Sequence, residues 1–230
     1  ITPKTRAVYI NSPHNPTGCV LPQEEMEHLL KLTREHGLWL VSDEVYNHFT
    51  YDGKITPSFL QLSDSNDRLI VTNTFSKNWC MTGWRLGWMI YPQGMELIFD
   101  NLGQFNTTSV ATFLQYGAIA ALDEGDEFIN HFVQRSKIGR NIICSSLESA
   151  PRVRIVRPEA TFYAMFSVDG MNDALESSKQ ILREANVGVA PGAGFGLGAE
   201  SYLRVCFGVD HELLEDAANR LGDFFAKASI

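Results

Sequence analysis

Three short apolar runs, each followed within a few positions by polar side chains, constrain the fold of this chain most strongly. They occupy residues 7–10, 38–41 and 69–72. Their length and apolar content predict buried strands. Helical stretches or long loops separate the runs, which is typical of strands that lie parallel in a sheet covered by helices. The sequence therefore predicts an α/β fold with a mainly parallel sheet.

The helices expected around this sheet follow from apolar periodicity and from breakers. Residues 22–36 are amphipathic, with Pro22 suited to a first helical turn and Gly37 just past the end. Residues 86–91 predict a further strand, which Pro92 closes. Further helices are expected at 93–103, 108–123 and 126–149.

A second domain is expected after the long helix at 126–149, because Pro151 marks a boundary. Beyond it, strands at 152–156, 162–167, 187–190 and 201–206 alternate with helices at 172–185 and 210–227. This alternation is an α/β or α+β pattern. We predict a larger domain over residues 1–145, including the long linking helix, and a smaller α/β domain over 146–230.

Composition excludes several functional classes. The 230 residues can bury a substantial core, and 44% are hydrophobic and 20% charged, as in soluble globular proteins. No apolar run reaches the roughly 18 residues of a membrane helix, and the start shows no signal-peptide pattern. The net charge of −8 argues against nucleic acid as a partner. Four scattered cysteines without C-x-x-C spacing, and six histidines without a metal-binding pair, predict no metal site and a reducing cytoplasm.

The segment 73–87 carries the most specific chemistry. Lys77 follows an apolar run and is flanked by the hydroxyls of Thr74 and Ser76, and Arg85 lies eight residues further on. A lysine amine can form a Schiff base with an aldehyde cofactor. Hydroxyls and an arginine can hold an anion nearby. This combination indicates chemistry with pyridoxal 5′-phosphate (PLP).

Two other segments place polar residues beyond predicted strands. Asn-Ser-Pro-His-Asn-Pro-Thr-Gly, residues 11–18, contains Asn15, and Leu-Trp-Leu-Val-Ser-Asp-Glu-Val-Tyr, residues 38–46, contains Asp43. In parallel sheets, ligands collect at the carboxyl ends of strands. Asn15, Asp43 and Lys77 all lie just beyond such ends, so pattern and chemistry agree.

Together these motifs resemble the class I/II aminotransferases of PLP fold type I, the group that includes aspartate aminotransferase. The order Asn15, Asp43, Tyr46, Lys77, Arg85 and Arg204 follows that family's order and approximate spacing. The resemblance covers essentially the whole chain but begins partway through the family's large domain. It implies a three-layer α/β/α large domain that is only partly present. The N-terminal glycine/serine loop for the cofactor phosphate and the aromatic residue that stacks on the ring are expected to be missing.

The resemblance implies four contacts with the cofactor ring. Lys77 would form the Schiff base and move a proton between the substrate α-carbon and the cofactor. Asp43 would pair with the pyridine nitrogen, with Glu44 as the competing acid. Tyr46 and Asn15 would donate hydrogen bonds to the O3′ oxygen. The alternatives are a solvated lysine, a capping aspartate, a core tyrosine and a turn asparagine.

The resemblance also implies two anion sites. Arg85, with Ser76 and Thr74, would hold the cofactor phosphate, because a planar guanidinium suits a phosphate dianion. Arg204 lies in an alternating strand pattern that points it away from its apolar neighbours, and with Asn15 it would bind the substrate carboxylate. A surface ion pair for Arg85 and a solvent-facing strand arginine at 204 are the alternatives.

Three further segments are less specific. Ala160 stands where the family usually carries glycine, so the backbone conformation around it is expected to be less certain to match the family's. Residues 106–109 resemble a stretch that approaches the neighbouring subunit in dimeric relatives, which favours a homodimer. The glycine-rich run 191–198 lacks G-x-G-x-x-G spacing and is expected to form a flexible loop near the substrate.

The leading functional hypothesis is a cytoplasmic aminotransferase of amino acid metabolism that uses aspartate or a broad range of amino acids. It would move an amino group between an α-amino acid and a 2-oxo acid by a ping-pong cycle. A PLP-dependent carbon–sulfur lyase or related fold type I enzyme is one alternative, because it shares most of the same anchors. A catalytically silent fragment is the other, because part of the phosphate site is expected to be absent.

Overall fold

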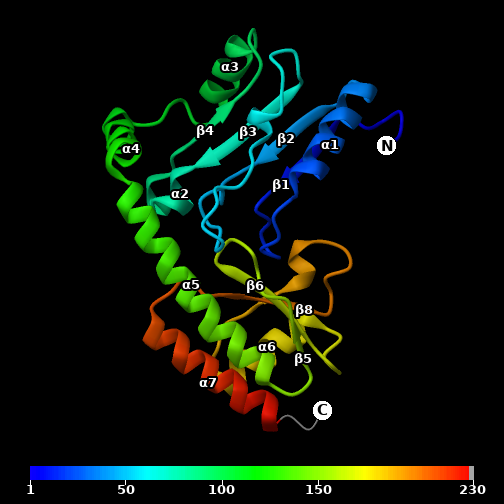
Figure 1. Cartoon of the computed structure of the whole chain (residues 1–230), viewed down its shortest axis with the longest axis vertical. Coiled ribbons are helices and arrows are strands. Elements are labelled where there is room, and N and C mark those ends of the chain that lie inside the picture. Colours follow the sequence, from blue (N-terminus) through cyan, green and yellow to red (C-terminus); the bar gives the residue numbers. More distant parts are fainter. Residues whose placement is uncertain (228–230) are drawn as a thin grey trace. The chain divides into compact units, whose positions relative to one another are not determined.

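The structure, a computed structural model, describes residues 1–227 and divides into two compact units (Figure 1). The first unit comprises Ile1–Pro13 and Val20–His131. The second comprises His14–Cys19 and the chain from Phe132 onward. The division at His131 falls earlier on the long helix than the predicted boundary at residue 145, and segment 14–19 joins the second unit. The predicted domain limits remain a prediction.

The first unit is built on a four-stranded sheet in the order β1-β2-β3-β4. Its strands are β1 (Ala7–Asn11), β2 (Trp39–Asp43), β3 (Leu69–Thr74) and β4 (Gly87–Ile90). The first three are parallel and β4 runs antiparallel beside β3. The predicted mainly parallel sheet is therefore confirmed, and all four predicted strands are present. Parallel pairing brings the carboxyl ends of β1, β2 and β3 to one edge.

Helix α1 (Gln23–His36) packs its apolar stripe on this sheet. Met26 and Leu30 are buried against Leu40 and against strand β3. The helix ends at Gly37, which adopts the left-handed conformation at φ 61° that glycine accommodates without strain. The predicted helix and its glycine stop are therefore confirmed.

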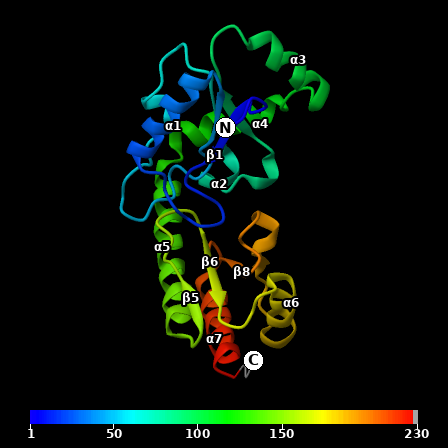
Figure 2. The same ribbon diagram turned by 90° about the vertical axis from the view of Figure 1, so that its right-hand side faces the viewer.

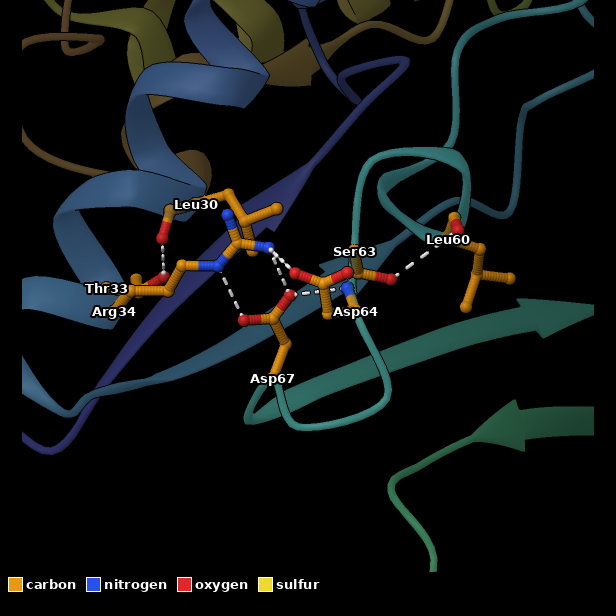
Figure 3. A network of polar contacts seen from close by, with 7 residues as sticks. All are labelled: Leu30, Thr33, Arg34, Leu60, Ser63, Asp64 and Asp67. Carbon is orange, nitrogen blue, oxygen red and sulfur yellow. Dashed lines mark hydrogen bonds and ion pairs between the residues drawn. The ribbon is translucent and has the colours of Figure 1, made fainter.

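An ion pair fastens α1 to the loop before β3 (Figure 3). Nε and Nη2 of Arg34 bond the two carboxylate oxygens of Asp67 at 2.7 and 2.6 Å. The backbone nitrogen of Asp64 donates to the same carboxylate. These bonds, those from Arg34 foremost, hold the pKa of Asp67 below its usual value, although burial opposes them. The pair thus stabilises the connection between the helix and the third strand.

The remaining helices of the first unit follow β3 and β4. They are α2 (Phe75–Asn78), α3 (Glu96–Asn106), α4 (Thr112–Glu124) and the start of α5 (Asp126–Ser149). Short 3₁₀ turns lie at Phe59–Gln61 and Thr82–Trp84. The bounds of α5 agree with the prediction, whereas α3 and α4 begin a few residues later than expected.

The second unit carries a four-stranded sheet in the order β5-β6-β8-β7. Its strands are β5 (Val153–Ile155), β6 (Tyr163–Val168), β7 (Ala190–Pro191) and β8 (Tyr202–Cys206). Every pairing in it is antiparallel, so of the two predicted patterns this unit has the α+β one. The strand expected at 187–190 is only two residues long.

Helices α6 (Ala174–Ala185) and α7 (His211–Lys227) pack together in the second unit, beside the sheet (Figure 2). Its core contains fully buried apolar side chains from α5, α6, α7, the strands and the residue after β8: Ile143, Leu147, Phe166, Ile181, Leu203, Phe207, Leu214 and Leu221. Within residues 1–227, no helix has both the length and the apolar character needed to cross a membrane.

Candidate functional site

Three predicted site residues lie at the carboxyl edge of the first unit's sheet. Asp43 ends β2 and pairs in register with Thr72 of β3. Lys77 lies in α2, directly after β3. Its Nζ is 5.9 Å from the centroid of the Tyr46 ring, and that tyrosine is almost fully buried. The structure therefore brings an amine, a carboxylate and a phenol to the same edge, as the motif spacing predicts.

The carboxylate of Asp43 is held at both oxygens. Oδ2 accepts a 2.8 Å hydrogen bond from the hydroxyl of Tyr9, and Oδ1 accepts one from the backbone nitrogen of Val45 at 3.3 Å. Tyr9 is 63% exposed as a residue, but partial burial of its hydroxyl and then the bond to Asp43 raise its pKa to about 12, because a phenolate beside a carboxylate is unfavourable. The neighbouring acid, Glu44, is buried and accepts from Ser42 and from the backbone of Phe59, which gives it a role in the core.

Sequence reasoning missed Tyr9. Tyr9 and Asn11 share one face of β1, and Asn11 pairs in register with Asp43. The sequence predicts that alternate residues of β1 share a face, but it does not predict that β2 is the neighbour of β1. Tyr9 could be found only once the strand order was known.

A second missed contact joins the segments that carry Tyr46 and Lys77. Asn78 is completely buried, and its Nδ2 donates to Oδ1 of Asn47 at 2.9 Å. Each asparagine directly follows a predicted site residue. The bond therefore ties the turn after β2 to α2, which limits movement of the tyrosine and the lysine relative to each other.

Thr74 and Ser76, both predicted to bind phosphate, have different surroundings. The hydroxyl of Thr74 caps α2: it accepts from the backbone nitrogen of Ser76 and donates to the carbonyl of Leu86 at 2.9 Å. Its only proton is thus already committed, so a phosphate contact from Thr74 would cost that bond. The hydroxyl of Ser76 forms no hydrogen bond with any other residue in the described part of the chain, which leaves it able to donate.

Arg85 closes the 3₁₀ turn Thr82–Trp84 in the left-handed conformation, at φ 55°. Its side chain is exposed, and Nη1 donates to the carbonyl of Thr82 at 3.0 Å. Among residues 1–227 no carboxylate pairs with it, so the alternative of a surface ion pair is not supported. Gly87 follows two positions later, where a Cβ would lie 2.8 Å from the carbonyl oxygen of Asn73. Glycine is needed there for β4 to approach β3.

Asn15 and Arg204 lie together in the second unit. Nη1 of Arg204 donates to Oδ1 of Asn15 at 2.8 Å, across 189 positions of sequence. The Asn-Pro-Thr-Gly turn is fastened to the same unit, because the carbonyl of Gly18 accepts from the backbone nitrogens of Glu159 and Ala160. These two predicted carboxylate-binding residues are therefore brought into direct contact.

Ala160 fits its position despite the expected glycine. It is completely buried, and it is not among the residues with positive φ. The left-handed residue is its neighbour Thr161, at φ 65°. The departure from the family pattern therefore leaves Ala160 in an ordinary conformation.

The environment of Arg204 is aromatic. Its neighbours Leu203 and Val205 point into the core while Arg204 points the other way, as the alternation predicts. The guanidinium carbon is 4.1 Å from the centroid of Tyr163 and 4.5 Å from that of Phe195, which ends a 3₁₀ turn in the glycine-rich run. A cavity of about 460 Å³ in this unit is lined by the segments 14–19 and 195–199, among others.

The residues of the first unit fit PLP chemically. Lys77 carries an amine suited to its aldehyde, Asp43 a carboxylate suited to its ring nitrogen, and Tyr46 a hydroxyl of the kind that bonds its phenolic oxygen. Ser76 and Arg85 supply donors for a phosphate. No cluster of three or more histidine, cysteine or acidic side chains suited to a metal ion occurs in the part of the chain that the structure describes.

Comparison with known proteins decides the family. The family model described as aminotransferase class I and II matches residues 1–221. The chain belongs to this family. The aromatic-amino-acid aminotransferase 2 of Thermococcus litoralis is 36% identical over 96% of the chain, and the aspartate aminotransferase of Bacillus subtilis is 35% identical over all of it.

Solved structures of aminotransferases share the fold. The aromatic aminotransferase of Pyrococcus horikoshii has a TM-score of 0.93 at 33% identity over 99% of the chain. The aspartate aminotransferase of Thermotoga maritima has a TM-score of 0.90 at 33% identity. The predicted PLP fold type I architecture is thereby confirmed. The chain spans 57% and 60% of the length of the two relatives named above, and 61% and 58% of these two structures.

Proposed function

We propose that this protein is a PLP-dependent aminotransferase that transfers an amino group between an α-amino acid and a 2-oxo acid. One observation carries the proposal: Asp43, Tyr46 and Lys77 lie at the carboxyl edge of one parallel sheet. Membership in the aminotransferase family supports it. Aspartate or a broad range of amino acids would be the donor, since the relatives include aspartate and aromatic aminotransferases.

Lys77 would anchor the cofactor and move the proton of the reaction. When bound, PLP supplies an electron-withdrawing ring that stabilises negative charge on the substrate α-carbon. Lys77 Nζ would hold the aldehyde carbon of the cofactor and then, once displaced by the substrate amine, take the proton from the α-carbon. It forms no ion pair with the residues that the structure describes, so no bond to a carboxylate would have to break first.

Asp43 would accept a hydrogen bond from the pyridine nitrogen. Its two oxygens are oriented by Tyr9 and by the backbone of Val45, so the carboxylate is held before the cofactor arrives. Tyr46 would donate to the phenolic oxygen, and its burial beside the lysine limits its rotation. The donor role of Asn15 toward the same oxygen remains a prediction.

Ser76 and Arg85 would hold the cofactor phosphate by charge-assisted hydrogen bonds. Thr74 would act mainly by capping α2, which orients Ser76 and Lys77. In the second unit, Arg204 would bind the substrate α-carboxylate with Asn15 beside it.

We also propose that the enzyme acts as a homodimer. Helices α3 and α4 carry large apolar side chains in solvent, among them Phe105, Phe113 and Tyr116 at 93%, 73% and 70% exposure. Apolar surface of this extent is typical of protein–protein contacts. Sedimentation of the purified protein tests this directly.

A half-reaction tests the proposed activity. The PLP-loaded protein is mixed with aspartate without any 2-oxo acid, and the products are counted. A transaminase releases one 2-oxo acid per cofactor and no ammonia, and then stops until an acceptor is added. Continuous release of ammonia and pyruvate from cystathionine would instead assign a lyase and contradict the proposal. Lys77→Ala should abolish the half-reaction, whereas Lys54→Ala, which removes an exposed lysine of the same unit, should not.

A further inference from the structure

Two aromatic rings from different elements flank the guanidinium of Arg204. Tyr163 begins β6, which pairs directly with β8, and its ring centroid is 4.1 Å from the guanidinium carbon. Phe195 lies in the glycine-rich run between β7 and β8, at 4.5 Å. Both distances are within the range in which a cation is attracted to the face of a ring. All three side chains belong to the second unit.

The charge of Arg204 is not balanced by a carboxylate. Four of the seven other arginines in the second unit pair with an acid: Arg157 with Glu148, Arg154 with Asp169, Arg135 with Asp210 and Arg220 with Asp216. Within residues 1–227, Arg204 has no such pair, and Nη1 bonds the neutral amide oxygen of Asn15. Its Nε is buried without any hydrogen-bond acceptor. A guanidinium that is only partly buried and lacks a counter-ion is suited to an external anion, which would approach its Nη groups because Nε itself is buried.

Aromatic contacts with a guanidinium have a specific geometric consequence. They cover part of its surface with groups that accept no in-plane hydrogen bond, so an anion is directed to the edges where the N–H groups point. They also limit the rotamers of a long side chain before the anion arrives. A planar carboxylate binding bidentately along an edge gains from both effects.

We propose that Tyr163 and Phe195 are positioning residues that hold the Arg204 guanidinium for edge-on pairing with a carboxylate. The ligand class is an amino acid or 2-oxo acid bound through its α-carboxylate, and this identification rests on the proposed function. The two rings contact arginine and not the reacting atoms. Their removal should therefore change carboxylate binding and leave the chemistry at the amine end unchanged.

The experiment follows the Nε–H resonance of Arg204 by NMR in the chain of residues 1–230, with pyruvate as the probe. Arg204→Lys assigns the signal. In the wild type the resonance should lie upfield, because protons near the face of a ring are shielded, and it should move on addition of pyruvate. Phe195→Leu should shift it downfield and weaken pyruvate binding about 3- to 10-fold, the worth of one partly exposed cation–ring contact.

Matched variants separate positioning from a general loss of structure. Tyr202 lies on the same strand and lines the same cavity but makes no cation–ring contact with Arg204, so Tyr202→Leu should leave both the shift and the affinity unchanged. Phe195→Tyr keeps a ring and should restore wild-type values even if Phe195→Leu disturbs the fold.

Two results would overturn different parts of this proposal. An unchanged resonance and an unchanged pyruvate affinity in Phe195→Leu would overturn the proposed positioning role. If the wild-type resonance is shielded by the rings but does not respond to pyruvate, carboxylate binding at Arg204 fails, and with it this part of the proposed function. That second result would overturn the ligand assignment while leaving the aromatic contacts themselves established.

Discussion

The hydroxyl of Tyr9 donates a 2.8 Å hydrogen bond to Oδ2 of Asp43, from one parallel strand to the next. It fixes the orientation of the acid that we expect to face the cofactor ring. Burial of the hydroxyl, and secondly this bond, raise the pKa of Tyr9 to about 12 from its ordinary value of 10.0. Because the folded-state pKa is the higher one, the stabilising effect is complete below pH 10 and is lost as the pH rises toward 12.

The Tyr9–Asp43 bond predicts an unusual alkaline titration. At pH 11, Tyr9 should remain mostly protonated, so the wild type and Tyr9→Phe should show nearly equal phenolate absorbance at about 295 nm. In an Asp43→Asn background the pKa should fall, because the charge of the carboxylate is removed. At pH 11 the phenolate signal of Tyr9 should then be larger than in the wild type, although burial, the larger cause of the raised pKa, remains. Equal absorbance of the two Asp43→Asn proteins would contradict the assigned contact.

The Arg34–Asp67 pair predicts a loss of stability in acid. The pKa of Asp67 is below its ordinary value of 3.8, so the pair stabilises the fold above that pH and the effect fades as acid protonates the carboxylate. Arg34→Gln should lower the free energy of unfolding in urea by about 1–2 kcal/mol at neutral pH, because the arginine is partly exposed.

The control for this pair is Lys31→Gln, on the same helix. Nζ of Lys31 lies 3.9 Å from Oε1 of Glu35, and both side chains are largely exposed. Removing this pair should therefore lower the free energy of unfolding by less than about 0.5 kcal/mol. The difference in unfolding free energy between Arg34→Gln and wild type should shrink as the pH is lowered. A difference that stays constant down to acid unfolding would contradict this prediction.

We predict that the Asn-Pro-Thr-Gly turn requires glycine at position 18. Its φ is +72°, and an added Cβ would lie 2.2 Å from Cβ of Pro158. Gly18→Ala should therefore destabilise the protein by at least about 2 kcal/mol, from strain and overlap together. Gly188→Ala is the matched control, since no atom lies within 4 Å of its Cβ position. Thermal unfolding of the two variants should differ clearly, and equal midpoints would refute the close approach.

Local pattern predicts most of this fold. The parallel strands are short apolar runs, and the bounds of α5 are correct because its periodicity runs unbroken from Asp126 to a proline at 151. The strand expected at 187–190 is shorter because Asn186 ends α6 in the left-handed conformation and pairing with β8 begins only at Ala190. Such pairing depends on the partner strand, which a local pattern does not contain.

In the site too, local motifs identify some residues, whereas contacts made only by folding identify others. Asp43, Tyr46 and Lys77 are identified by motif, and the structure places them at one edge of the sheet. Tyr9 and Phe195 are not identified by motif, because their contacts with Asp43 and Arg204 join residues that become adjacent only after the sheets form. The commitment of the Thr74 hydroxyl to Leu86 was also hidden, since it depends on β4 returning beside β3.

The role of Lys77 is tested by locating the lysine that reacts with PLP. The purified protein is incubated with PLP, reduced with borohydride, digested and mapped by mass spectrometry. We expect an absorbance band on addition of PLP and a label concentrated on Lys77, with both lost in Lys77→Ala and kept in Lys54→Ala. A label spread evenly over surface lysines, with no absorbance band, would contradict the assignment of Lys77 as the cofactor anchor.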